Sequence, residues 1–149
     1  MTWKIKHYDD LTKSELYHIL QERTKVFVVE QNCPYQEVDG KDLASYHLYQ
    51  SDETGRIIAY LRILPAGISY TEASLGRVLV AEQYRKKGIA SELVGKALHY
   101  VRHELNEQAV RISAQAHLEG FYQSFGFKTT SEPYLEDGIP HINMLVQLS

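Results

Sequence analysis

The segment Val78–Leu93, VLVAEQYRKKGIASEL, most constrains how this chain can fold. It opens with the apolar run of a buried strand. Further on, apolar residues recur at i, i+3, i+4 and i+7, the spacing of a helix that covers a core: Ala90, Leu93, Val94, Ala97, Leu98, Val101 and Leu105. The segment therefore predicts a strand that ends near Val80, then a short loop, and then a long helix that begins at about Gly88.

The loop between them carries three cations, Arg85, Lys86 and Lys87, directly before Gly88. Unpaired N–H groups and the helix dipole favour anions at a helix start, so cations there are unfavourable unless an external anion joins them. Gly88 also allows close approach to the backbone. Neither G-x-x-x-x-G-K-[ST] nor G-x-G-x-x-G occurs. We therefore expect this loop to bind the diphosphate of a carrier other than the ligands of P-loop and dinucleotide-binding proteins. The alternative is a solvated basic loop with no ligand.

Composition predicts one globular domain spanning residues 1–149. Hydrophobic residues make up 44% and charged residues 23% of the chain, and the net charge of −3 argues against a nucleic-acid partner. The single cysteine, Cys33, excludes an intramolecular disulfide and indicates a reducing compartment. Since no apolar run approaches the ~20 residues of a membrane span and no signal peptide is evident, we expect a cytoplasmic protein without membrane contact.

Elsewhere the apolar spacing alternates between strand and helix periods. A strand is predicted at 3–8, and a T-x-x-E capping box, Thr12 and Glu15, starts a helix that runs to about Gln31. Strands follow at 45–50, 56–64 and 74–81, then the long helix, a strand at 109–116 and a short helix at 118–126. Two last strands flank an Asp137-Gly138 turn, and their hairpin offers an edge for a homodimer. This order predicts an α+β fold.

Four segments resemble the GCN5-related N-acetyltransferase (GNAT) family. Arg85–Ala90 fits its pyrophosphate loop, [QR]-x-x-G-x-[GA], although Glu82 stands where the family often has proline and Ala90 replaces the commoner glycine. AQAHLEGFYQSFGF resembles a later family segment that ends F-Y-x-x-x-G-F. RTKVFVVEQNCPYQEVDGKD and YLEDGIPHINM are similar to the ElaA-like branch. The resemblance implies a three-layer α/β/α sandwich with a mixed, mostly antiparallel sheet splayed at the fourth strand.

The resemblance also implies a reaction. Acetyl-CoA would donate its acetyl group directly to a primary amine of a small molecule or peptide, with no metal; a non-catalytic acyl-CoA-binding module acting through a protein partner is the alternative. The residues expected to bind acetyl-CoA are Val78, Leu79, Val80, Arg85, Lys86, Lys87, Gly88, Ile89, Ala90 and Ser91.

Tyr122 matches the family tyrosine near the sulfur and is the expected general acid, although its spacing also suits an aromatic helix face with Phe121 and Phe125. The base is left open among carboxylates and imidazoles that each also suit a surface or turn role: Glu30, Glu37, Asp39, His47 and His141. The three acidic residues weakly favour a cationic acceptor. His99 and His103 lack a third metal ligand, and Cys33 is expected to pack or to line the substrate site.

Overall fold

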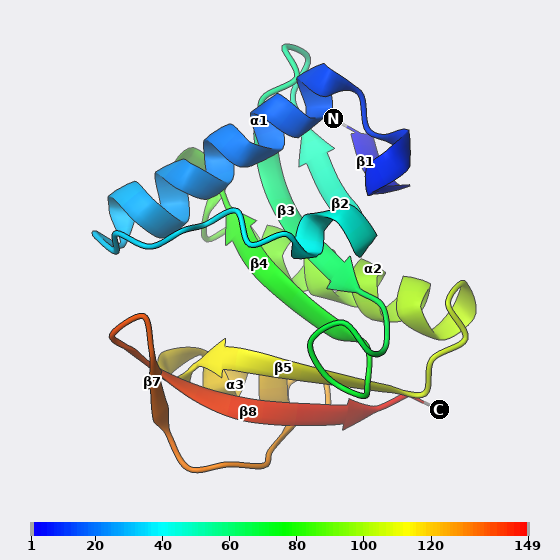
Figure 1. The fold of residues 1–149 in the computed structure, drawn as a ribbon, viewed down its shortest axis with the longest axis vertical. Helices are drawn as coiled ribbons and strands as arrows, with labels where there is room; N and C mark the ends of the chain where they lie inside the picture. The colour runs from blue at the N-terminus through cyan, green and yellow to red at the C-terminus, as the bar shows by residue number, and fades with distance from the viewer. Residues whose placement is uncertain (1, 149) are drawn as a thin grey trace.

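The computed structural model describes residues 2–148, so the ends of the predicted domain, Met1 and Ser149, lie outside the described residues. Figure 1 shows the elements in chain order: β1 (Thr2–His7), α1 (Lys13–Arg23), β2 (Tyr46–Ser51), β3 (Ile57–Leu64), β4 (Ser74–Val80), α2 (Ile89–His103), β5 (Ala109–Gln115), α3 (Glu119–Gln123), β6 (Lys128–Thr129), β7 (Tyr134–Glu136) and β8 (Ile139–Gln147). This is the predicted order with one addition, the short strand β6.

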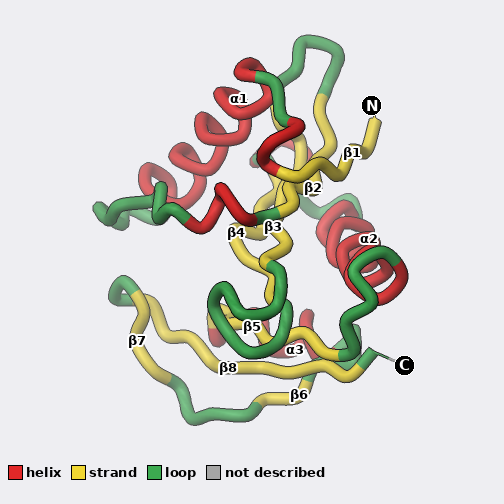
Figure 2. The backbone as a smooth tube through the Cα atoms, turned by 45° about the vertical axis from the view of Figure 1, so that its right-hand side comes forward, coloured by secondary structure: helices red, strands yellow, loops and turns green. Residues whose placement is uncertain are grey.

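The strands form two groups that diverge after β4. β1, β2, β3 and β4 pair antiparallel in that order, and β5 pairs with β8, which also pairs with β6 and β7. Within residues 2–148, the backbone pairing between the groups is one isolated parallel bridge, Ala73 with Val110. The separation of β4 from β5 is visible in Figures 1 and 2. The splay predicted at the fourth strand is confirmed.

Helices cover both faces of this sheet (Figure 1). Ile19 of α1 belongs to a buried cluster with Tyr49, Tyr60 and Leu79 on one face. On the other face lies the main core, to which α2 contributes the inner residues of the predicted stripe: Leu93, Val94, Ala97 and Val101, all fully buried. Tyr122 and Phe127, within and after α3, join the same core. The α/β/α layering is as expected.

The first helix begins as predicted and changes geometry near its end. The Thr12 hydroxyl accepts a hydrogen bond from the Glu15 N–H at 3.0 Å, and the Glu15 carboxylate accepts one from the Thr12 N–H at 2.9 Å, which completes the capping box. From Thr24 to Glu30 the helix continues as a π-helix. Its extent was therefore predicted, but its wider turns were not.

A β-bulge interrupts β4 at the centre of the molecule. Leu79 pairs with Tyr60 and Gly76 pairs with Arg62, so two residues of β4, Arg77 and Val78, oppose a single residue of β3. Arg77 has a φ of 54°, in the left-handed region that non-glycine residues rarely adopt. Because a bulge bends its strand and increases the local twist, it directs the second half of β4 away from β5.

Candidate functional site

A cleft of about 780 Å³ opens where β4 and β5 separate. One half is lined by the end of β4, the start of α2 and the aromatic residues around α3: Val78, Leu79, Val80, Tyr84, Arg85, Lys86, Gly88, Ile89, Ala90, Ser91, Phe121 and Tyr122. The other half is polar and includes Cys33, Tyr35, Asp39, Lys41, Arg62, Arg77, Glu136 and His141. The cleft thus brings together most of the residues predicted to bind acetyl-CoA and several of the candidate bases.

The start of α2 suits an anion. Gly88 is its N-cap, with a φ of 80°, and no side chain among the described residues caps the first turn. The amides of this turn therefore point outward without a side-chain acceptor. A Cβ on Gly88 would meet no atom within 4 Å, so the need for glycine at this position is conformational.

The three predicted cations of the loop differ in their surroundings. Arg85 donates from Nε to the Val80 carbonyl at 2.8 Å and from Nη2 to Glu30 at 2.9 Å, so its guanidinium is partly occupied and its charge is paired. Lys87 does not line the cleft, and its Nζ lies 5.8 Å from the centre of the Tyr84 ring. Lys86 lines the cleft, is exposed and forms no ion pair within residues 2–148. Of the three side chains, Lys86 is the best placed to meet an anion.

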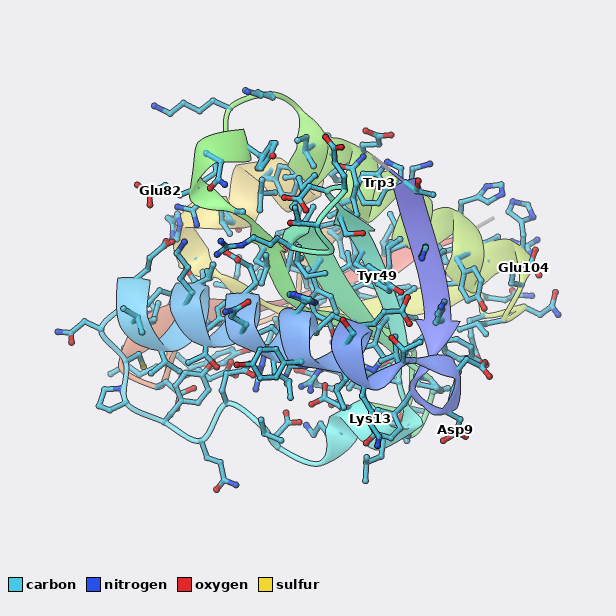
Figure 3. The ribbon with its side chains drawn as sticks, turned by 90° about the horizontal axis from the view of Figure 1, so that it is seen from above. Trp3, Asp9, Lys13, Tyr49, Glu82 and Glu104 are labelled. Carbon is cyan, nitrogen blue, oxygen red and sulfur yellow. The ribbon has the colours of Figure 1, made fainter. Side chains whose placement is uncertain are left out.

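The Arg85–Glu30 pair also joins two segments that are far apart in the chain. Figure 3 shows α1 running from Lys13 toward the side of the molecule that carries Glu82, the residue opening the turn before Arg85. Glu30 ends the π-helical continuation of α1 and lines the cleft. Its carboxylate is therefore close to the Arg85–Gly88 loop and already paired with a cation.

Tyr122 lies in the cleft wall and in the core at once. Its ring is 5% exposed and makes edge-to-face contacts with Phe121 and Phe127 at 5.1 and 5.7 Å between centroids. Burial raises the pKa of its phenol to about 12, so the hydroxyl keeps its proton at neutral pH. It makes no hydrogen bond to another residue of the described chain. The aromatic packing and the position facing the cleft are both present.

Two of the candidate bases, Glu37 and Asp39, belong to a network of ion pairs. Glu37 is buried, lies outside the cleft lining, and pairs with Arg23 at 2.8 Å and with Arg77. Asp39 pairs with Arg62 at 2.6 Å and with Arg77 at 3.3 Å. Burial alone would raise the pKa of Asp39, but the hydrogen bonds and charge of Arg62 outweigh it and hold the pKa well below its usual range. Both carboxylates are therefore already paired with arginines.

His47 is not in the cleft. It is fully buried on β2, where its Nδ1 accepts a hydrogen bond from the Tyr60 hydroxyl at 2.6 Å and its Nε2 donates one to the Asp42 carbonyl at 3.1 Å. Burial lowers the pKa of the imidazole, which favours the neutral ring that this arrangement needs. The structure therefore gives His47 a place in the core rather than the one expected of a base.

His141 does line the cleft. Its Nδ1 donates a hydrogen bond to the Ile139 carbonyl at 2.7 Å, and its Nε2 lies 3.5 Å from the Glu136 carboxylate. Since the proton on Nδ1 is engaged with the carbonyl, Nε2 is the nitrogen that can accept another. His141, Glu30 and Asp39 line the cleft, and of these three His141 is the one that forms no ion pair with a cation among the described residues.

The sequence analysis missed several groups of this site. Glu136 lies on β7, across the Asp137-Gly138 turn from His141 on β8, and it also accepts a hydrogen bond from the Ser113 hydroxyl at 3.1 Å. That hydroxyl lies 2.6 Å from the Tyr134 hydroxyl. The arginines of the network, Arg23, Arg62 and Arg77, were not predicted either. These side chains come from separate elements, so no spacing along the chain reveals their contacts.

Within residues 2–148, no helix has the length and apolar character needed to cross a membrane. No group of three or more His, Cys, Asp or Glu side chains in this range has an arrangement that would hold a metal ion.

Comparison with known proteins identifies the class to which this fold and cleft belong. The family model described as "Acetyltransferase (GNAT) domain" matches residues 9–148, and the chain belongs to this family of acyltransferases. It lies in the ElaA-like branch: Protein ElaA of Escherichia coli (strain K12) is 44% identical over 146 residues, which are 95% of this chain and 94% of that protein.

Two solved structures agree with this placement. An acyl-CoA N-acyltransferase from Pseudomonas aeruginosa superposes with a TM-score of 0.91 at 44% identity, and Escherichia coli ElaA with a TM-score of 0.90 at 42% identity. Each alignment covers 97% of this chain and 98% of the other. The family and the fold implied by the sequence resemblance are thereby confirmed.

Proposed function

We propose that the protein is an acetyl-CoA-dependent N-acetyltransferase that transfers the acetyl group directly to a primary amine of a small molecule or peptide. One observation carries the proposal: the half of β4 that has separated from β5 leads, within a single cleft, to the uncapped start of α2. The free edge of the strand can hydrogen-bond with the pantetheine amides of coenzyme A, and the helix start can bind its pyrophosphate.

The chain's own groups suit this ligand. Backbone groups of Val78, Leu79 and Val80 would pair with the pantetheine amides as a neighbouring strand does. The amides from Arg85 to Ser91 would hold the pyrophosphate, and Lys86 would add a flanking charge. Since β5 does not occupy the edge of β4 beyond the bulge, the ligand has backbone partners there.

The transfer needs a stabilised oxyanion and a proton for the departing thiolate. A backbone N–H of Leu79 or Val80 would donate to the oxyanion, and a preorganised donor of this kind contributes about 3 kcal/mol. Tyr122 would donate to the thiolate, because its buried phenol stays protonated at neutral pH. Leu79, Val80 and Tyr122 line the same cleft, which supports these roles.

The amine must also lose a proton. An alkyl ammonium has a pKa of roughly 10, so about one molecule in a thousand is free amine at pH 7. We propose that His141 accepts the proton at Nε2, directly or through water, while the Ile139 carbonyl holds the ring and the Glu136 carboxylate stabilises the imidazolium that forms. This choice follows from the position of His141 in the cleft wall and from the cations that already pair with Glu30, Glu37 and Asp39.

The proposal is tested by measuring free thiol release and acetylated product from acetyl-CoA with a panel of primary amines. We expect turnover with at least one amine and a loss of about a hundredfold in kcat for His141→Gln. His103→Gln, which changes an exposed histidine of α2, is the matched control. Coenzyme A binding without release from any amine would favour the non-catalytic module, and an absence of coenzyme A binding would overturn the proposal altogether.

A further inference from the structure

The polar half of the cleft, where the acceptor amine would bind, contains cationic side chains with N–H groups that no acceptor of the described chain occupies. Lys41 donates from Nζ to the Ser69 hydroxyl at 2.8 Å and has no carboxylate within 4 Å among the described residues. Arg62 is 4% exposed, and its buried Nε has no hydrogen-bond partner among the described residues. Arg77 keeps 20% of its side chain exposed. All three residues line the cleft.

The charges of this wall leave one cation in excess. Asp39 is the common partner of Arg62, at 2.6 Å, and Arg77, at 3.3 Å. From Lys41 it accepts only the backbone N–H, at 3.0 Å, so the Lys41 ammonium has no carboxylate partner among the described residues. Four cations, Arg23, Lys41, Arg62 and Arg77, therefore accompany three carboxylates, Glu37, Asp39 and Asp42, which leaves a formal charge of +1. Carboxylates predicted to attract a cationic acceptor are thus outnumbered by their own partners.

The facing wall has the opposite character. Glu136 and Asp137 lie at the β7–β8 turn beside His141, and all three residues line the cleft. The two walls approach closely at this end, because the Cys33 thiol donates to the Asp137 carbonyl at 3.2 Å. A small molecule in this half therefore meets a cationic wall and an anionic wall together.

Resting on the proposed function, we propose that the acceptor is an amino acid, a primary amine that also carries a carboxylate. The carboxylate binds on the side of Lys41 and Arg77, where it neutralises the unpaired charge and accepts from unused N–H groups. The amine is then directed toward Glu136 and the His141 Nε2, which is to accept its proton. The carboxylate of such a molecule meets the cationic wall and its amine meets the anionic wall, whereas an amine without a carboxylate interacts with the anionic wall alone.

The test compares acceptors that differ only in the carboxylate. Thiol release from acetyl-CoA is measured for L-phenylalanine, L-phenylalaninamide and phenethylamine, and for 4-aminobutyrate, 4-aminobutanamide and butylamine, with rates expressed per concentration of free amine. We expect the acid of at least one series to exceed its amide and its amine about tenfold or more in kcat/KM. Equal rates within both series would overturn the inference but leave the proposed function standing, whereas no release with any compound would overturn both.

Lys41→Gln ties the preference to this wall. The substitution removes the unpaired charge at a half-buried position whose side chain has one hydrogen bond, so the fold should persist. We expect the acid-to-amide ratio to fall toward one, while Lys128→Gln, on the exposed strand β6 outside the cleft, keeps the ratio of the wild type. A Lys41→Gln protein that unfolds at the same urea concentration and keeps the full ratio would overturn the assignment of the carboxylate to Lys41.

Discussion

Replacing Tyr122 by phenylalanine removes one oxygen atom from the proposed reaction site. The ring contacts with Phe121 and Phe127, at 5.1 and 5.7 Å between centroids, are kept. The hydroxyl makes no hydrogen bond to another described residue, so its loss leaves no buried partner unsatisfied. We therefore expect Tyr122→Phe to fold with nearly unchanged stability and to bind coenzyme A as the wild type does.

The size of the expected catalytic loss follows from the pKa of the phenol. Burial raises this pKa to about 12, whereas a thiol has a pKa of roughly 8.5, and the difference of about 3.5 pKa units corresponds to ~5 kcal/mol against complete proton transfer. Tyr122 would therefore stabilise the thiolate chiefly by donating a hydrogen bond. General acids contribute 10²–10⁴-fold, and this reasoning predicts a value near the lower limit, a loss of about 10² in kcat.

Thiol release at saturating acetyl-CoA and saturating amine measures kcat, and titration calorimetry measures the affinity for coenzyme A. Tyr17→Phe, at an exposed position of α1, is the control for the substitution itself. A Tyr122→Phe protein that keeps kcat within twofold would refute the role of the phenol. A parallel loss of coenzyme A affinity and stability would show that the residue matters through packing alone.

Three further predictions concern the loop and the fold. Lys86→Glu should weaken coenzyme A binding about five- to thirtyfold at low salt and less at 0.5 M salt, because exposed charges are screened; a salt-independent effect in calorimetry would contradict this. Hydrogen bonds from Thr12, Tyr49 and Lys6 outweigh the effect of burial and lower the pKa of Glu15 to about 2. Its contribution, about 1–3 kcal/mol lost in Glu15→Gln, should be complete above pH ~4.5 and disappear as the pH falls toward 2; urea unfolding tests this, and equal losses at both limits would refute it. Burial lowers the pKa of His47, so the unfolded chain takes up a proton first and stability should fall below pH ~6.5 by up to ~1.4 kcal/mol per unit; an equal slope in His47→Gln would refute this.

Local chemistry explains which parts of the fold could be predicted from the sequence. The capping box at Thr12 and Glu15 depends on two residues three positions apart, and the structure contains both of its hydrogen bonds. Asp137 and Gly138 have φ values of 52° and 76°, as a two-residue hairpin turn requires. The stripe of α2 is equally local, since one period of spacing determines its buried face.

What could not be predicted depends on contacts between distant segments. Glu37 and Asp39 look in the sequence like free carboxylates of a turn, because their partners Arg62 and Arg77 are 23 to 40 residues away. His47 resembles any histidine of a strand until the Tyr60 hydroxyl and the Asp42 carbonyl enclose it. The bulge at Arg77 depends on the register of β3, which no local pattern fixes.

The separation of β4 from β5 also affects how the molecule unfolds. Along the described chain, one bridge, Ala73 with Val110, connects the backbones of its two strand groups. A ligand that hydrogen-bonds along β4 while it packs against β5 would connect the two strand groups. Its binding should therefore make the unfolding of the two groups more cooperative. At a concentration of a hundred times its dissociation constant, such a ligand adds about 2.7 kcal/mol to the free energy of unfolding. The melting temperature of the protein should therefore rise with the concentration of this ligand.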